Sequence, residues 1–272
     1  PMPLTDSSLY YFVMMKVSEN EGWLYVKFHH IISDGVSMGI FTRELAELYE
    51  GKELSPLNLQ YKDYSAWQRE LSTKEEMKRQ EAYWLNLFKD EVPMLNMPTD
   101  YKRPPIQSTE GDLVQFEIDS DLSANLKKMA KEHGVTLYML LLAGYTALLS
   151  KYTGQEDIVV GSPIAGRPHD DLKDVIGMFV NTLAMRNYPK GDKSFCDYLT
   201  EVKETALKAY ENQDYPFDEL VEKLDLTRDM SRSALFDTMF VMQNFDHDEF
   251  EMKDLTFAPY EMEAHVSKFD LT

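Results

Sequence analysis

Cysteine is nearly absent from the sequence: among 272 residues, Cys196 is the single one. One thiol cannot build a disulfide framework, which favours a reducing compartment such as the cytoplasm. Basic residues are also scarce, with 28 Lys and Arg against 47 Asp and Glu and a net charge of −19. Because such a chain repels phosphate groups and anionic lipids, we expect neither nucleic acid nor a membrane as a partner. The longest nearly apolar run, 137–149, is too short to span a bilayer.

The hydrophobic pattern alternates between strand-like and helix-like segments. Two apolar stretches on either side of a turn cluster, 9–17 and 23–30, predict a β-hairpin. Helical spacing and capping residues predict five helices, at 36–49, 74–89, 122–133, 136–152 and from Ser194 onward. Further strands are predicted at 113–118, 157–161 and 234–244. This order predicts a layered α/β architecture with a mixed sheet.

Prolines gather near the end of the first third of the chain. Four of the twelve lie close together: Pro93, Pro98, Pro104 and Pro105. Such a cluster is typical of a boundary between lobes, and an ordinary long loop is the alternative. Because a new strand–helix pattern follows, we favour the boundary. We therefore predict an N-terminal lobe over 1–95, a linker over 96–110 and a C-terminal lobe over 111–272.

Residues able to do chemistry are concentrated between His29 and Gly35. If the strand at 23–30 is regular, His30 lies on its apolar face and His29 on the other. Burial disfavours a charged imidazole, so His30 is suited to act as a base near pH 7. Asp34 is able to pair with a cation and hold the turn. The structural alternatives are a core histidine and a helix N-cap. A metal site is disfavoured because the two histidines face apart.

The segment 29–35 resembles the H-H-x-x-x-D-G motif of condensation domains of nonribosomal peptide synthetases, within the chloramphenicol-acetyltransferase-like superfamily. The resemblance covers most of the chain, because further segments match the family in order: 61–67, 161–167, 176–182 with Arg186, 212–218 and 228–235. Within these segments, Ser65, Ser233 and Ala234 depart from the family's usual residues.

This resemblance implies an α/β fold with two lobes in a V, mixed sheets and a central tunnel. It also implies the reaction. Donor and acceptor peptidyl carrier proteins deliver an acyl or peptidyl thioester and an aminoacyl thioester on their phosphopantetheine arms, and the amine attacks the thioester to form a peptide bond. The domain itself binds no cofactor, and an adenylation domain is a neighbour.

The resemblance also implies which residues form the active site: His29, His30, Asp34 and Gly35. His30 faces the tunnel centre and His29 is structural, while Asp34 is architectural and the Gly35 N–H lies near the reacting carbonyl. Ser162 and Asn181 are weaker candidates for residues that line the tunnel and bind substrate. Capping or turn contacts are the equally weighted alternative for these two.

The family's early motifs, which carry an arginine expected to pair with the motif aspartate, have no counterpart before His29. The resemblance therefore implies a fragment that lacks both ends, in which Asp34 is without its usual partner. An epimerisation domain of the same superfamily and a non-catalytic docking remnant are the alternatives. The Gly35-x-Ser37 continuation and the segment 179–182 favour condensation, and the histidines disfavour heterocyclisation.

Overall fold

The chain divides into two compact units in a computed structural model that describes residues 4–5, 8–71, 73–226, 229–243, 250–252, 254–258, 260 and 265–272. Unit 1 comprises Pro1–Glu70, Ala165–Val180 and Asn244–Tyr260. Unit 2 comprises the rest: Leu71–Ile164, Asn181–Gln243 and Glu261–Thr272. The proline-rich segment 96–110 lies inside unit 2 in this division. The lobes 1–95 and 111–272 and the linker between them stay predictions.

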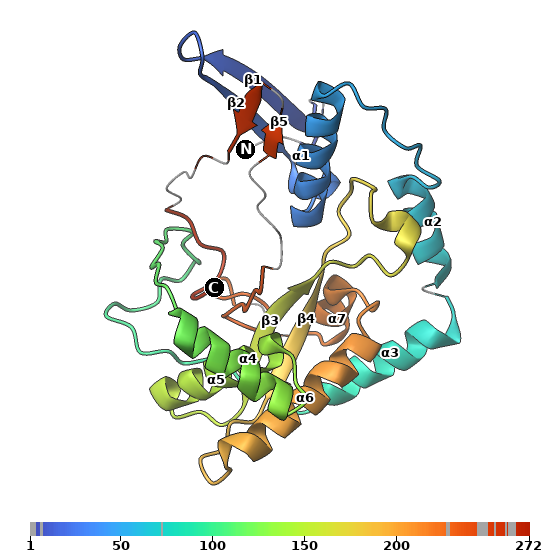
Figure 1. Cartoon of the computed structure of the whole chain (residues 1–272). Helices are drawn as coiled ribbons and strands as arrows, with labels where there is room; N and C mark the ends of the chain where they lie inside the picture. The colour runs from blue at the N-terminus through green and yellow to red at the C-terminus, as the bar shows by residue number, and fades with distance from the viewer. Residues whose placement is uncertain are drawn as a thin grey trace. The chain divides into compact units, whose positions relative to one another are not determined.

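Unit 1 begins with the predicted hairpin. β1 (Tyr10–Lys16) pairs antiparallel with β2 (Gly22–Phe28), and a 3₁₀ turn (His30–Ile32) leads into α1 (Gly35–Tyr49). Helix α1 lies alongside the hairpin (Figure 1), where the rings of Phe12 and Phe41 stack with centroids 5.6 Å apart. The second strand ends at Phe28, two residues earlier than predicted, so His30 is outside the strand.

A second cluster in unit 1 joins segments that are far apart in sequence. Helix α2 (Tyr61–Leu71), which the sequence pattern did not predict, packs its Tyr64 ring against Phe179, with centroids 4.7 Å apart. Leu172 and Val175 complete this cluster. The strands β5 (Phe250–Met252) and β6 (Leu255–Phe257) pair antiparallel.

The sheet of unit 2 is mixed, as predicted. β3 (Ile158–Ile164) pairs antiparallel with β4 (Asn181–Asn187), which was not predicted. On the other side of β3, the Gly161 N–H donates to the Thr238 carbonyl at 2.9 Å, and this segment runs parallel to β3. Within 234–243 the predicted strand is reduced to isolated bridges at Thr238 and Met239; its last predicted residue, Asn244, lies outside the described residues.

Helices cover this sheet. α5 (Leu137–Thr153) and α6 (Phe195–Glu211) pack on each other and on the two strands, and α4 (Ser120–Glu132) packs on α5. α3 (Glu75–Leu87) packs on α7 (Phe217–Lys223). The predicted caps Thr136 and Ser194 are confirmed, because each side chain accepts a backbone N–H of the following helix.

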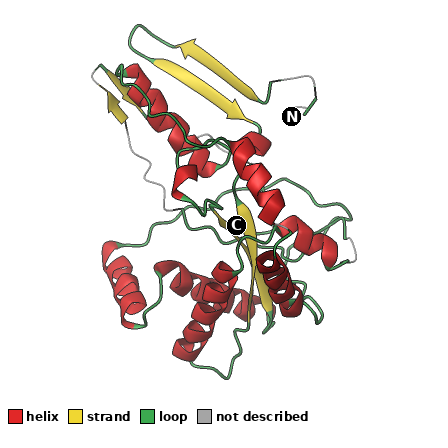
Figure 2. Cartoon of the chain, turned by 90° about the vertical axis from the view of Figure 1, so that its right-hand side faces the viewer, coloured by secondary structure: helices red, strands yellow, loops and turns green. Residues whose placement is uncertain are grey.

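The strand predicted at 113–118 is wrong. Residues 88–119 contain neither helix nor strand. Figure 2 shows long loops between the helices and strands of the molecule. The apolar residues of 113–118 favour a strand, but a strand needs a hydrogen-bonded neighbour, and among the described residues the pairing next to this segment is the bridge from Glu110 to Val266. Among the described residues no single helix is long and apolar enough to cross a membrane; α4 and α5 satisfy that criterion only together, as a pair bent by 105°.

Candidate functional site

His30 lies in the 3₁₀ turn after β2, and its side chain is exposed. The prediction that it is buried on the apolar face of the strand is wrong, because the strand has already ended. Its Nδ1 lies 2.8 Å from the Ser33 carbonyl oxygen. A carbonyl oxygen only accepts hydrogen bonds, so Nδ1 carries the proton, and the lone pair of the neutral ring is on Nε2. The turn therefore presents Nε2 as the nitrogen able to receive a proton.

His29 makes a different contact. Its Nδ1 accepts the Ile31 N–H at 3.1 Å and so caps the 3₁₀ turn. The tautomer is opposite to that of His30, since Nδ1 must be unprotonated to accept. This geometry supports the structural role that the resemblance implies for His29.

Asp34 is buried at the N-terminus of α1, with a side chain 0% exposed. Its Oδ1 accepts the Ser37 N–H at 2.8 Å, which makes it the N-cap, and its Oδ2 accepts the Phe179 N–H at 3.0 Å. The Arg167 Nη2 lies 3.1 Å from Oδ1 and 3.4 Å from Oδ2. Asp34 therefore pairs with a cation at the turn, as its position predicts, although the arginine is not the one expected from the family's early motifs. The cation comes from later in the sequence, at the end of the segment 161–167, where no role had been assigned to it.

The Arg167 side chain is itself 7% exposed and ties the segment 165–180 to α1. Its Nη1 donates to the carbonyl oxygens of Leu172, at 2.8 Å, and Val175, at 2.6 Å. The guanidinium carbon lies 4.0 Å from the centroid of the Phe179 ring. A buried ion pair is stable only when its remaining polar atoms have partners, and these contacts supply most of them.

The pentapeptide Gly35–Gly39 also matches the letters G-x-S-x-G of a serine-hydrolase elbow. The structure rules out that role, because Ser37 is 1% exposed within the first turn of α1 and not on a tight strand-to-helix turn. Its Oγ lies 2.7 Å from Asp34 Oδ1, 2.8 Å from the Gly177 oxygen, and 3.1 Å from both the Gly177 nitrogen and Arg167 Nη2. Ser37 is a buried connector that the sequence prediction missed.

Tyr61, the first residue of α2, contacts the segment 165–180 close to the polar group formed by Asp34, Ser37 and Arg167. Its hydroxyl donates to the Met178 carbonyl at 2.9 Å, and burial, with a smaller contribution from the charge of Asp34, raises the pKa of Tyr61. A Cβ at Gly177 would lie 2.2 Å from the Tyr61 ring, which no real contact allows. Only glycine therefore fits beside this ring.

Gly35 is the first residue of α1 and is exposed. The backbone bonds of the helix start with the Met38 N–H, which donates to the Asp34 carbonyl at 3.1 Å. The Gly35 N–H consequently has no acceptor within the helix, as for any first-turn residue. This N–H is therefore free to donate to an acceptor from outside the helix, at the N-terminus of α1.

Ser162 and Asn181 belong to unit 2 and bond within it. The Ser162 hydroxyl accepts from the Tyr138 hydroxyl at 2.7 Å and is buried. The Asn181 amide donates to the carbonyl oxygens of Gln213 and Tyr215, both at 2.8 Å. These are contacts of the capping and turn kind, and a role of either residue in binding substrate stays a prediction.

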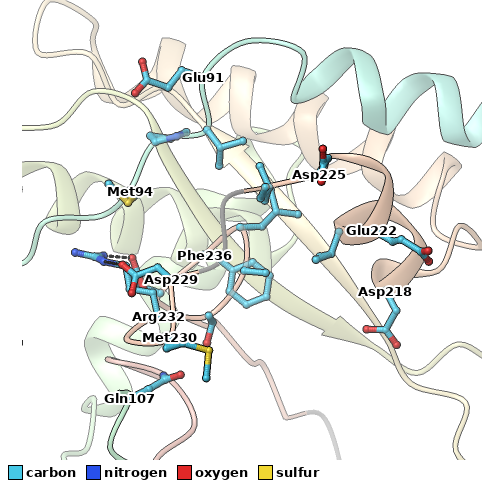
Figure 3. A pocket seen from close by; sticks show the side chains of 18 residues that line it. Glu91, Met94, Gln107, Asp218, Glu222, Asp225, Asp229, Met230, Arg232 and Phe236 are labelled. Atoms are coloured by element: carbon cyan, nitrogen blue, oxygen red, sulfur yellow. Dashed lines mark hydrogen bonds and ion pairs between the residues drawn. The ribbon is translucent and has the colours of Figure 1, made fainter. Parts of the chain in front are cut away.

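Unit 2 also contains a cavity of about 1070 Å³, shown in Figure 3. Its lining includes the acidic residues Asp218, Glu222 and Asp225 and the apolar residues Leu235 and Phe236. None of the predicted site residues lines it. The residues of the histidine motif, 29–35, lie in unit 1 and are not part of this cavity.

Comparison with known proteins decides the family. The family model described as "Condensation domain" matches residues 1–272. The chain belongs to the condensation-domain family. Bacitracin synthase 3 of Bacillus licheniformis is 68% identical over 272 residues, and gramicidin S synthase 2 of Aneurinibacillus migulanus is 50% identical over 273 residues. These matches cover 100% of this chain but 4% and 6% of the relatives, so the condensation domain spans a small part of each.

Solved structures confirm the predicted fold class. A four-domain nonribosomal peptide synthetase bound to AMP and glycine matches this condensation domain with a TM-score of 0.83 and 25% identity, over 90% of this chain and 19% of that chain. The X-domain in a complex with OxyB from teicoplanin biosynthesis matches with a TM-score of 0.82 and 25% identity, over 99% of this chain and 61% of that chain. The α/β fold is thus that of condensation domains.

Proposed function

We propose that this chain forms peptide bonds as the condensation domain of a cytoplasmic nonribosomal peptide synthetase. Two peptidyl carrier domains, one of them next to an adenylation domain, present the substrates on phosphopantetheine arms, and the condensation domain binds no cofactor of its own. The acceptor amine attacks the donor thioester carbonyl, the new C–N bond forms and the C–S bond breaks. The departing thiolate takes up a proton as the amine loses one.

Within this proposal His30 hydrogen-bonds the attacking amine through Nε2 and receives its proton late. The fixed Nδ1–H, donated to Ser33 beside the buried Asp34, is the observation that carries the assignment. An α-amine with a pKa near 8 is already partly neutral at pH 7. General-base help is worth about 10²–10⁴-fold, whereas oriented reactants reach effective molarities of roughly 10⁵–10⁸ M. Positioning therefore outweighs proton removal, and the Gly35 N–H assists by polarising the donor carbonyl.

The test uses the complete protein with a donor carrier bearing an aminoacyl thioester and an acceptor carrier bearing a second one. We expect mass spectrometry to detect a dipeptidyl thioester on the acceptor carrier and none when either carrier is unloaded. Exchange of the α-proton with one carrier alone, without a dipeptide, would replace the proposal by epimerisation. Binding of carriers without either reaction would replace it by a docking role.

A further inference from the structure

We propose that Ser37 is the positioning residue that fixes the orientation of His30. The inference deepens the proposed function, on which its kinetic part rests. It starts from the surroundings of Ser37, which lies near the centre of the cluster in unit 1 without contacting the exposed histidine. The helix, the buried ion pair and the segment 165–180 meet at its hydroxyl.

The hydrogen-bonding capacity of the Ser37 hydroxyl is fully used. A hydroxyl donates one hydrogen bond and accepts two. Ser37 accepts from the Gly177 N–H and from Arg167 Nη2, each at 3.1 Å. It donates either to Asp34 Oδ1, at 2.7 Å, or to the Gly177 carbonyl, at 2.8 Å. Removing this oxygen leaves buried donors and acceptors without a partner, which costs more than an ordinary surface hydrogen bond.

The connection to His30 runs through one peptide group. Ser33 and Asp34 are both extended, with φ/ψ of −157°/148° and −129°/−177°. The oxygen that accepts the His30 Nδ1–H belongs to the planar peptide that joins these two residues. Its direction therefore depends on how Asp34 is anchored. Ser37 contributes to this anchoring through its N–H and, when its hydroxyl donates to Oδ1 and not to the Gly177 carbonyl, through the hydroxyl. Loss of the hydroxyl weakens the anchoring, so that the peptide rotates more easily and the imidazole changes its tautomer.

Three variants of the complete protein separate positioning from mere stability. Ser37→Ala removes the hydroxyl, and Ser37→Thr retains it. Thr42→Ala is the matched control, because Thr42 lies in the same helix and its hydroxyl donates only to the local Met38 carbonyl at 2.9 Å. We expect Ser37→Ala to lower kcat for dipeptide formation by up to about 100-fold with KM unchanged. Ser37→Thr restores most of kcat, and Thr42→Ala has no effect.

A second measurement does not depend on turnover. Solid-state ¹⁵N NMR of histidine-labelled protein at a pH where the ring is neutral reports which ring nitrogen carries the proton, with His30→Gln identifying the signal. We expect protonated Nδ1 in the unmodified protein, Ser37→Thr and Thr42→Ala, and a mixture of tautomers in Ser37→Ala. If Ser37→Ala does not fold, Ser37→Cys, which keeps a γ atom but is a much weaker hydrogen-bond donor and acceptor, replaces it in both measurements.

The proposal is overturned if the Nδ1–H tautomer persists in the folded Ser37→Ala protein, or if its kcat equals that of Thr42→Ala. A protein that makes no dipeptide at all would refute the proposed function. The tautomer comparison would then still decide the part played by Ser37.

Discussion

A buried charge pair is the residue-scale feature on which the site depends. Asp34 and Arg167 are nearly inaccessible to solvent, and taking both charges out of water costs several kcal/mol for each ion. Their net contribution to stability is therefore small compared with the loss that follows when one partner is removed. The pair fixes where the segment 165–180 meets α1, and its value lies in specifying that geometry.

We expect Arg167→Gln to lower the free energy of unfolding by about 3–5 kcal/mol, because it leaves the Asp34 carboxylate buried without its cation. Urea unfolding followed by circular dichroism measures this. Arg43→Gln is the matched control in the same unit, since the ion pair of Arg43 with Asp174 is exposed and worth at most about 1 kcal/mol. Equal losses in the two variants would contradict the buried-pair argument.

The proposed late proton transfer to His30 leads to a second prediction at this scale. His30→Ala should slow dipeptide formation by about 10²–10⁴-fold in a single-turnover assay with saturating loaded carriers. Some turnover should remain, because the amine is partly neutral and the carriers still orient both substrates. No detectable product from a folded His30→Ala protein that binds both carriers would show that the histidine does more than assist.

At the scale of elements, local signals were sufficient for some parts and not for others. Thr136 and Ser194 predicted their helices because a cap and the residues that it satisfies are neighbours in sequence. The strand prediction at 113–118 was wrong because a strand depends on a paired neighbour, which the local sequence pattern does not supply. Arg167 was missed as the partner of Asp34 because the two are 133 positions apart, and no periodicity connects them. The motif of residues 29–35 identified the candidate site, whereas its supporting contacts are long-range.

The close packing of α2 on the segment 165–180 requires a glycine at position 177, beside the Tyr61 ring. We expect Gly177→Ala to destabilise unit 1 and to lower activity, since its Cβ would meet the Tyr61 ring at 2.2 Å. Moving the ring away would strain the hydrogen bond from its hydroxyl to the Met178 carbonyl. The loss should fall in the range of about 1–3 kcal/mol that is typical of overpacking.

Gly39→Ala is the control for this prediction. Gly39 lies inside α1, where a Cβ would meet nothing within 4 Å, and alanine is the better helix former by about 1 kcal/mol. Thermal unfolding should therefore show a lower Tm for Gly177→Ala and an equal or higher Tm for Gly39→Ala. A Tm unchanged by Gly177→Ala would mean that α2 adjusts freely to the added methyl group.

At the scale of the whole molecule, the two units are interleaved along the chain. Unit 1 is complete only when the segment 165–180 has returned from between β3 and β4 of unit 2. The site in unit 1 consequently depends on chain connections that run through unit 2. Destabilising unit 2 should therefore also affect the cluster around Asp34, although the hydrogen bonds described for Asp34 all lie within unit 1.

Buried tyrosines provide a way to destabilise unit 2 without mutation. Burial raises the pKa of Tyr83 and of Tyr198 to about 12. In the unfolded chain these hydroxyls ionise near pH 10. Their contribution to stability is complete below pH ~10 and is lost as the pH rises towards 12, because over that range the unfolded state releases protons that the folded state retains. The urea midpoint should thus fall steeply between pH 10 and pH 12.

Absorbance of tyrosinate at 295 nm and the urea midpoint, measured together at several pH values, check this prediction. Tyr198→Phe should make the urea midpoint fall less steeply with pH. The substitution removes the hydroxyl that contacts Thr146, but the Thr146 hydroxyl still donates to the Leu142 carbonyl at 2.8 Å and is not left without a partner. Tyr101→Phe is the control, since Tyr101 is 86% exposed and its ionisation does not require unfolding. If both variants changed the alkaline slope equally, the sensitivity would come from general charge repulsion in a chain of net charge −19 and not from buried hydroxyls.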